Sequence, residues 1–145
     1  MNDLPQLSGP EAEPASGGPA KQLIIFVHGY GADGNDLFSL SQYFAHVAPD
    51  AAFISPNAPY RCAGAPFGYQ WYDVWMQDPA ERLAAIRSTA AIFDNFVTEQ
   101  LDRRGLTEGN LVLIGFSQGT MMSLFTAPRR EKAVAGIVGY SGRME

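Results

Sequence analysis

The stretch Leu111-Val112-Leu113-Ile114-Gly115-Phe116-Ser117-Gln118-Gly119 decides the fold of this chain, because it joins an apolar run to a G-x-S-x-G pentapeptide. Between a buried strand and a helix, such a pentapeptide makes a sharp, strained turn that exposes the serine hydroxyl above a sheet. Gly115 and Gly119 flank this elbow and leave room for the strand and the helix to cross. We therefore predict a strand at 111–116, Ser117 at the turn, and a helix from Gln118 to about Ala127.

Upstream of the elbow, the hydrophobic pattern alternates between strands and helices. Residues 23–27 form a continuous apolar run, which is typical of a parallel strand covered on both faces. A glycine-rich loop follows at 28–34, and a helix is predicted at 36–47 with Asn35 or Asp36 as its cap. The apolar positions of this helix are Leu37, Leu40, Phe44 and Val47. Residues 51–54 predict a second short strand.

The region 55–79 is irregular and rich in aromatic residues, and a stretch of this length usually lines or covers a site. After Pro79, a helix with one apolar face runs to Arg103-Arg104-Gly105. The residues of this apolar face are Leu83, Ile86, Ala90, Phe93, Val97 and Leu101. The apolar run 133–140 predicts a last strand. This alternation predicts an α/β fold with a mostly parallel sheet, helices on both faces and an active site at the carboxyl ends of the strands.

Composition narrows the possible functions. With 145 residues, 46% of them hydrophobic, the chain can bury one core, and we divide it into a Pro/Gly-rich extended leader at 1–20 and a domain at 21–145. The net charge of −5 argues against a nucleic-acid partner. Neither a group of metal-ligating residues nor an apolar stretch of about 20 residues is present, so we expect no cofactor, no metal and no stable membrane insertion. The lone Cys62 and the lack of a secretory signal favour the cytoplasm.

Ser117 is predicted to be a nucleophile that loses its proton to a base as it attacks a carbonyl carbon. The oxyanion that forms needs hydrogen-bond donors already in place. The backbone N–H of Gln118, directly after the serine at a helix N-terminus, is one such donor. For the other we predict the N–H of Tyr30, in the glycine-rich loop that follows the first strand.

Four segments together resemble one protein family: His28–Asp36, Ser55–Pro59, Trp71–Asp73 and Gly115–Gly119. In order and spacing they are similar to the motifs of the phospholipase/carboxylesterase family. These α/β-hydrolases include bacterial carboxylesterases and acyl-protein thioesterases. The resemblance extends over nearly the whole chain, from about Leu4 to Gly142.

The resemblance implies a serine esterase that hydrolyses small carboxylic esters or acyl thioesters through an acyl-serine intermediate on Ser117. It implies an oxyanion hole made by the N–H groups of Tyr30 and Gln118. It also implies that the loop 56–75 shapes the acyl pocket. The residues that we assign to this pocket are Phe67, Trp71 and Trp75. Those expected to support the oxyanion loop are His28, Gly29 and Gly31.

The chain departs from the family pattern after Ser117, because no histidine follows it. In the family, further strands follow the segment that matches Tyr140-Ser141-Gly142, and after them come the triad aspartate and histidine. We therefore expect a partial α/β-hydrolase fold, truncated after the strand that follows the nucleophile helix, with the acid and the base missing from this chain. His28 replaces the base only if a ring nitrogen lies within about 3 Å of the serine oxygen.

One alternative to an esterase is a non-catalytic module that binds acyl ligands or pairs with a partner. A pure binding protein has no need of a strained nucleophile, whereas the missing histidine favours this alternative. The apolar strand at 133–140 would form an uncovered edge, and exposed apolar edges recruit another chain. We expect a homo-oligomer or a complementing C-terminal chain to cover it.

Overall fold

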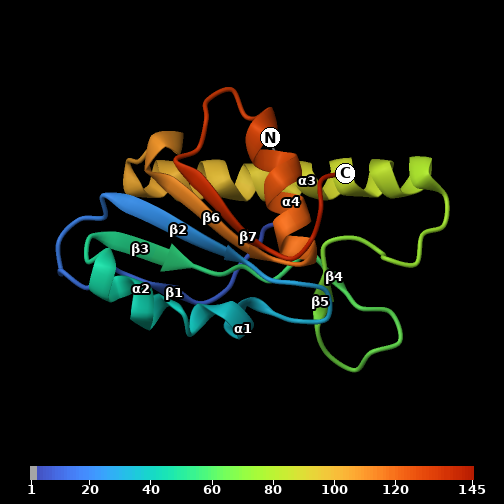
Figure 1. Ribbon diagram of the computed structural model, residues 1–145, viewed down its shortest axis with the longest axis horizontal. Coiled ribbons are helices and arrows are strands. Elements are labelled where there is room, and N and C mark those ends of the chain that lie inside the picture. Colours follow the sequence, from blue (N-terminus) through green and yellow to red (C-terminus); the bar gives the residue numbers. More distant parts are fainter. Residues whose placement is uncertain (1–2) are drawn as a thin grey trace.

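The computed structural model describes residues 3–145, and its elements follow the predicted alternation of strands and helices (Figure 1). Within these residues a five-stranded sheet has the order β1-β3-β2-β6-β7, in which β1 is antiparallel to β3 and the other pairs are parallel. The strands are β1 (Glu11–Ala12), β2 (Gln22–Val27), β3 (Ala51–Ile54), β6 (Leu111–Phe116) and β7 (Gly136–Tyr140). The predicted mostly parallel sheet is confirmed.

Helices cover both faces of this sheet (Figure 1). One face carries α1 (Gly34–Phe38) and α2 (Ser41–Val47), and the other carries α3 (Pro79–Arg104) and α4 (Gln118–Thr126). Short 3-10 turns, η1 (Glu108–Asn110) and η2 (Ala127–Arg129), precede β6 and follow α4. The predicted ends of α3 are confirmed, since the Asp78 side chain caps its first turn and Gly105 ends it in the left-handed conformation at φ 65°.

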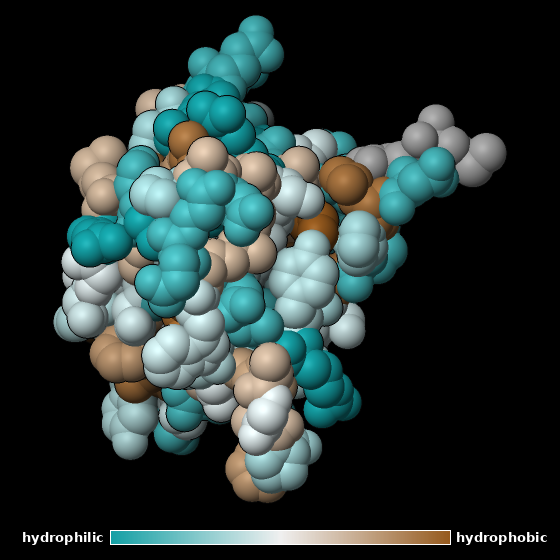
Figure 2. Space-filling model, turned by 90° about the vertical axis from the view of Figure 1, so that its right-hand side faces the viewer, coloured by the Kyte–Doolittle hydropathy of each residue, from teal (hydrophilic) through white to brown (hydrophobic). Residues whose placement is uncertain are grey.

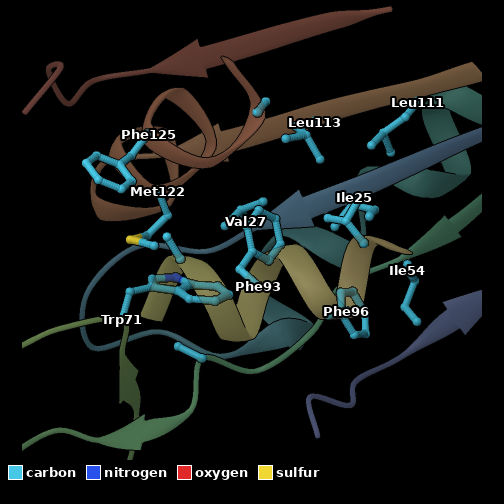
Figure 3. Packing of buried hydrophobic residues seen from close by; sticks show 14 of the residues in the cluster. Ile25, Val27, Ile54, Trp71, Phe93, Phe96, Leu111, Leu113, Met122 and Phe125 are labelled. Carbon is cyan, nitrogen blue, oxygen red and sulfur yellow. The ribbon is translucent and has the colours of Figure 1, made fainter. Parts of the chain in front are cut away.

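Strand β2 lies at the centre of the sheet and is buried on both faces. Leu23, Ile25 and Val27 belong to the larger core cluster, with α3 and α4 (Figure 3). The alternate residues Ile24 and Phe26 belong to the smaller cluster, with α1 and α2. Because successive side chains of a strand point to opposite faces, a strand covered on both sides must be apolar throughout. The continuous apolar run at 23–27 is therefore explained.

The prediction of one helix at 36–47, capped by Asn35 or Asp36, is wrong. The chain forms two short helices, and the N–H of Leu40 donates to the carbonyl of Leu37, an i→i−3 bond that tightens the junction. The cap is Asp33, whose carboxylate accepts the N–H of Asn35 at 2.8 Å. Val47 is 80% exposed and does not belong to the apolar face.

The leader and the aromatic loop are more ordered than the sequence pattern predicts. Residues 1–2 of the leader lie outside the described residues, but Glu11–Ala12 form β1 at the sheet edge, and Leu7 packs against the larger core. The loop contains an antiparallel pair, β4 (Tyr60–Arg61) and β5 (Tyr69–Gln70). Strands of two residues are too short to give a hydrophobic period, so these pairings do not show in the sequence.

Candidate active site

The sheet register brings the candidate residues to one end of the molecule. Val27, the last residue of β2, lies opposite Gly115 of β6, and Phe116 of β6 lies opposite Tyr140 of β7. The chain continues from these ends into His28 and Ser117, so both side chains stand at the carboxyl edge of the sheet, where the β4–β5 pair also lies (Figure 1). Figure 2 faces this end and shows hydrophilic and apolar side chains mixed across it.

Ser117 has the strained backbone that the pentapeptide predicts. Its φ of 54° and ψ of −115° are unusual for a residue with a side chain, and such strain costs about 1–3 kcal/mol. Two hydrogen bonds hold this conformation. The N–H of Ser117 donates to the carbonyl of Tyr140 at 2.8 Å, and the Ser117 carbonyl accepts the N–H of Met121 at 3.2 Å.

Close backbone approaches at the elbow explain its glycines. A Cβ on Gly119 would lie 1.8 Å from the carbonyl oxygen of Val27, and one on Gly115 would lie 2.7 Å from the backbone nitrogen of Thr120. A Cβ on Gly29 would lie 3.4 Å from the Cβ of Ser117, which shows how near the glycine-rich loop comes to the serine. The elbow and this loop therefore pack closely against each other, with the Phe116 ring also against Gly29.

His28 is fully buried, and both of its ring nitrogens are hydrogen bonded. Nδ1 lies 2.7 Å from the carbonyl oxygen of Gly29, and Nε2 accepts the N–H of Ala58 at 2.9 Å. Since a carbonyl can only accept, the proton is assigned to Nδ1, and the ring is neutral. Burial lowers the pKa of His28, outweighing the raising effects of the Gly29 carbonyl, Asp33 and Asp36. His28 has no free nitrogen for the Ser117 proton, so the alternative of His28 as base is wrong.

The backbone N–H groups of Tyr30 and Gln118 have no acceptor within residues 3–145. The neighbouring Gly31 is different, because its N–H donates to the carbonyl of Tyr69 at 2.9 Å. Gly31 has a φ of 81°, a left-handed conformation that glycine adopts without strain. The loop thus leaves the N–H of Tyr30 unpaired while it anchors the next residue to β5.

The Gln118 side chain ties the elbow to the aromatic loop. It is buried, its Oε1 accepts the N–H of Trp71 at 2.8 Å, and its Nε2 donates to the carbonyl of Tyr72 at 2.9 Å. Trp71 also donates from Nε1 to the carbonyl of His28 at 2.8 Å. These three bonds join segments that lie far apart in the sequence, and they position the loop beside Ser117.

A cavity of about 360 Å³ opens at Ser117. Tyr72, Val74 and Met121 give it apolar walls. The rest of its lining is Arg82, Ser141, Gly142, Arg143 and Glu145. Tyr72 is nearly buried, and its hydroxyl donates to the sulfur of Met121 at 3.4 Å. Burial, together with the nearby Glu145 carboxylate, raises the pKa of this phenol. It stays protonated at neutral pH.

The residues that the sequence assigns to the acyl pocket do not line this cavity. Trp71 is fully buried and lies beside Phe93 and Met122 in the core (Figure 3), with its ring centroid 5.4 Å from that of Phe93. Phe67 and Trp75 are 75% and 70% exposed, and neither lines the cavity. Sequence reasoning missed Tyr72 and Met121. Tyr72 lies next to Trp71 in the motif, and Met121 lies one helical turn after Ser117, which is the signal that could have found them.

The described part of the chain holds no group of three or more His, Cys, Asp or Glu side chains placed to bind a metal ion. A search of the same residues finds no helix long and apolar enough to cross a membrane. The Cys62 thiol is free and buried.

Comparison with known proteins gives consistent matches. The model of the phospholipase/carboxylesterase family matches residues 12–145. The curated acyl-protein thioesterase 1 of Kluyveromyces lactis is 30% identical over 136 residues, which cover 86% of this chain and 58% of that protein. Esterase YpfH of Escherichia coli is 28% identical over 125 residues, which cover 86% of this chain and 53% of that protein.

Among solved structures, that of esterase PE8 superimposes with a TM-score of 0.88 at 39% identity, covering 96% of this chain and 65% of the other. A carboxylesterase from Mesorhizobium loti has a TM-score of 0.72 at 20% identity, covering 96% of this chain and 62% of the other, and supports the fold alone. The chain spans about 60% of the length of the relatives that it matches.

Proposed function

The chain belongs to the phospholipase/carboxylesterase family, and we propose that Ser117 is the nucleophile of a carboxylic ester or thioester hydrolase. The observation that carries this proposal is the strained, positive-φ backbone of Ser117 at the carboxyl edge of the sheet. A fold keeps such a conformation only where its surroundings enforce it, and strain of this kind gathers at active sites. The names of the relatives, thioesterase and esterase, support the same reaction class.

In the proposed reaction, the Ser117 oxygen attacks the carbonyl carbon of the substrate while its proton passes to a base. The carbonyl oxygen becomes an oxyanion and accepts the N–H groups of Tyr30 and Gln118, which have no other acceptor within the described residues. Each donor of this kind stabilises the transition state by about 3 kcal/mol. The alcohol or thiol leaves, and water then hydrolyses the acyl-serine.

The base of this reaction is assigned to a residue outside this sequence. Both ring nitrogens of His28 are occupied, and His46 lies on α2, an element of the opposite face that contributes nothing to the cavity. We propose that a complementing segment supplies the acid and the base and covers β7. Support comes from the exposure of Val138 and Tyr140 and from an apolar cavity of about 370 Å³ between α1, α2 and the β6–β7 end.

The experiment that tests the nucleophile is labelling with a fluorophosphonate, read by intact mass. Ser117→Ala should abolish the mass that the label adds. Ser39 is an exposed serine at the end of α1, and Ser39→Ala should leave the labelling unchanged. Labelling is expected to be slow without the base and faster when the complementing segment is added. Equal labelling of Ser117→Ala and the parent protein would refute the proposal.

A non-catalytic acyl-binding module is the second candidate, and the observation that favours it is the absence of a free histidine nitrogen beside Ser117 within residues 3–145. Under this alternative, acyl ligands bind but fluorophosphonate does not react, with or without added segments. We also propose a cytoplasmic location, because the single cysteine is a free thiol, as is usual in a reducing compartment.

A further inference from the structure

One short segment of the chain, residues 55–58, holds both ends of the glycine-rich loop. At the start of the loop, Nε2 of His28 accepts the N–H of Ala58 at 2.9 Å. At its end, the N–H of Gly34 donates to Oδ1 of Asn57 at 2.7 Å. The segment directly follows β3 in the chain, so both contacts are made from the end of a buried strand. None of the roles assigned above uses Asn57.

The contact between Asn57 and Gly34 has a fixed orientation. A backbone N–H can only donate, so the side-chain atom that faces it is the amide oxygen of Asn57. Gly34 is buried and is the first residue of α1, where the N–H groups find no partner within the helix. A Cβ on Gly34 would lie 2.2 Å from the carbonyl oxygen of Ser55, so backbone also packs on backbone here. Asn57 therefore supplies the acceptor that a buried donor needs, and it determines where the loop ends.

The leader supports the 55–58 segment from behind. The N–H of Ser55 donates to the carbonyl of Pro10 at 2.9 Å, and the N–H of Asn57 donates to the carbonyl of Ser8 at 2.9 Å. A Cβ on Gly9 would lie 1.9 Å from the carbonyl oxygen of Ser55, which shows how closely the two backbones approach. The backbone of Asn57 is thus bound on one side while its side chain binds the loop on the other.

Tyr30 lies between the two fixed ends of the loop. Its own N–H has no acceptor within the described residues. One further anchor lies beside it, since the N–H of Gly31 donates to the carbonyl of Tyr69 and the N–H of Tyr69 donates to the carbonyl of Ala32. The direction of the Tyr30 N–H therefore depends on the bonds that its neighbours make, and on no bond of its own.

We propose that Asn57 is a positioning residue for the reaction at Ser117. By holding Gly34, its side-chain oxygen keeps the loop where the N–H of Tyr30 meets the oxyanion. This inference rests on the proposed function, because it takes Ser117 as the nucleophile and the Tyr30 N–H as a donor to the oxyanion. It adds a residue outside the cavity on which that donor depends, and it gives the leader the task of supporting that residue.

The test measures the rate of fluorophosphonate labelling of the full chain against reagent concentration, because the phosphoryl oxygen of this reagent takes the place of the oxyanion. Asn57→Leu keeps a similar side-chain volume and removes the acceptor. We expect the maximal rate to fall about tenfold or more, since a misplaced oxyanion donor is costly. The reagent concentration at half the maximal rate should change little, because Asn57 does not line the cavity. Asn57→Asp retains an acceptor oxygen and should restore most of the rate.

Asn110 offers a matched control. It is half-buried like Asn57, and its Oδ1 accepts the backbone N–H of Thr107 at 3.1 Å. It lies in η1, before β6, at the end of that strand opposite to Ser117. Asn110→Leu loses the same kind of bond and should label at the parent rate, with urea unfolding used to choose conditions in which both variants are folded. Equal slowing by the two leucine variants overturns the proposal, as does an unchanged rate in Asn57→Leu.

The backbone amide resonance of Tyr30 gives a reading that needs no reaction. It should shift in Asn57→Leu, return toward its parent position in Asn57→Asp and stay in place in Asn110→Leu. An unmoved resonance in Asn57→Leu overturns the proposal. If Asn57→Leu fails to fold, Asn57→Gln replaces it in both measurements, because it carries the same amide on a longer stem and displaces the acceptor.

The two proposals fail in different ways. If the parent protein is not labelled at Ser117, the proposed function is wrong, and the Tyr30 resonance still decides whether Asn57 positions the loop. If the parent protein is labelled and Asn57→Leu is labelled equally fast, the nucleophile stands and the role of Asn57 is wrong.

Discussion

The two segments that meet beside the cavity at Ser117, the elbow and the aromatic loop, are built in different ways. On the elbow side, the backbone of Gly119 packs on the backbone of Val27, and Gly29 lies beside Ser117. Both ring nitrogens of the buried His28 are hydrogen bonded. On the loop side, Phe67 and Trp75 stand in solvent while Trp71 lies fully in the core. Ser117 therefore stands on a rigid support, and the loop beside it is attached at a few points, chiefly Trp71.

This difference predicts that the elbow tolerates no added atoms. Gly119→Ala places a Cβ 1.8 Å from the Val27 carbonyl oxygen, so the helix and the strand must move apart. We expect a loss of about 3 kcal/mol or more in the free energy of unfolding, measured with urea, because backbone cannot yield as a side chain does. The control is Gly109→Ala in η1, where the nearest atom to the new Cβ is 3.9 Å away and little should change. Similar stabilities for the two variants would contradict the rigid elbow.

The attachment of the loop is tested at its two tryptophans. Trp71→Phe removes the donor to the His28 carbonyl and leaves a void beside Phe93, for which we expect a loss of about 2 kcal/mol. The same change at Trp75, which is 70% exposed, should alter stability by no more than about 0.5 kcal/mol. Calorimetric unfolding of both variants measures the contrast. Equal losses would mean that the whole loop is packed as firmly as the elbow.

The elbow side could be predicted from the sequence because its signals are local. The pentapeptide at 115–119 contains the serine and both glycines, and the apolar run at 23–27 needs no partner to be recognised as a buried strand. The ends of α3 are equally local, since Asp78 and Gly105 act on the turns next to them. In each case the residue that decides the conformation lies within a few positions of the residues that adopt it.

The loop side could not be predicted, because its structure depends on contacts between distant residues. The Gln118 side chain accepts a hydrogen bond from the backbone N–H of Trp71, 47 positions away. With Trp71 fixed in this way, its indole lies in the core and the next residue, Tyr72, lines the cavity. An aromatic residue in a loop gives no sign of which of these places it takes. The strand β1 follows the same rule, since Glu11–Ala12 pair with Phe53 and Ile54 of β3, far along the chain.

His28 links the two sides, and its titration gives a pH dependence. In the unfolded chain a histidine takes up a proton as the pH falls through about 6.5, whereas in the folded protein burial lowers the pKa of His28 and the ring stays neutral. Below that pH the unfolded state binds more protons, so stability is complete above about 6.5 and falls on the acid side by at most about 1.4 kcal/mol per pH unit.

Urea unfolding between about pH 5 and pH 7 measures this dependence, in a range above the titration of ordinary carboxyl groups. His28→Asn should be less stable than the parent protein and should lose this part of the slope. His46→Asn, on the exposed surface of α2, should keep it. An unchanged slope in His28→Asn would show that the buried ring does not remain neutral in the folded protein.

The smallest effect is expected at the tip of the loop. Phe67 is 75% exposed and does not line the cavity at Ser117, so Phe67→Ser should change the stability by no more than about 0.5 kcal/mol. It should also leave the affinity of Ser117→Ala protein for methyl heptanoate unchanged. Val74→Ser is the comparison, since Val74 lines the cavity and the polar substitution should weaken binding severalfold through lost apolar contact. Equal weakening by both substitutions would mean that the tip of the loop folds over the bound acyl chain, and that the wall facing Ser117 is completed only by the substrate.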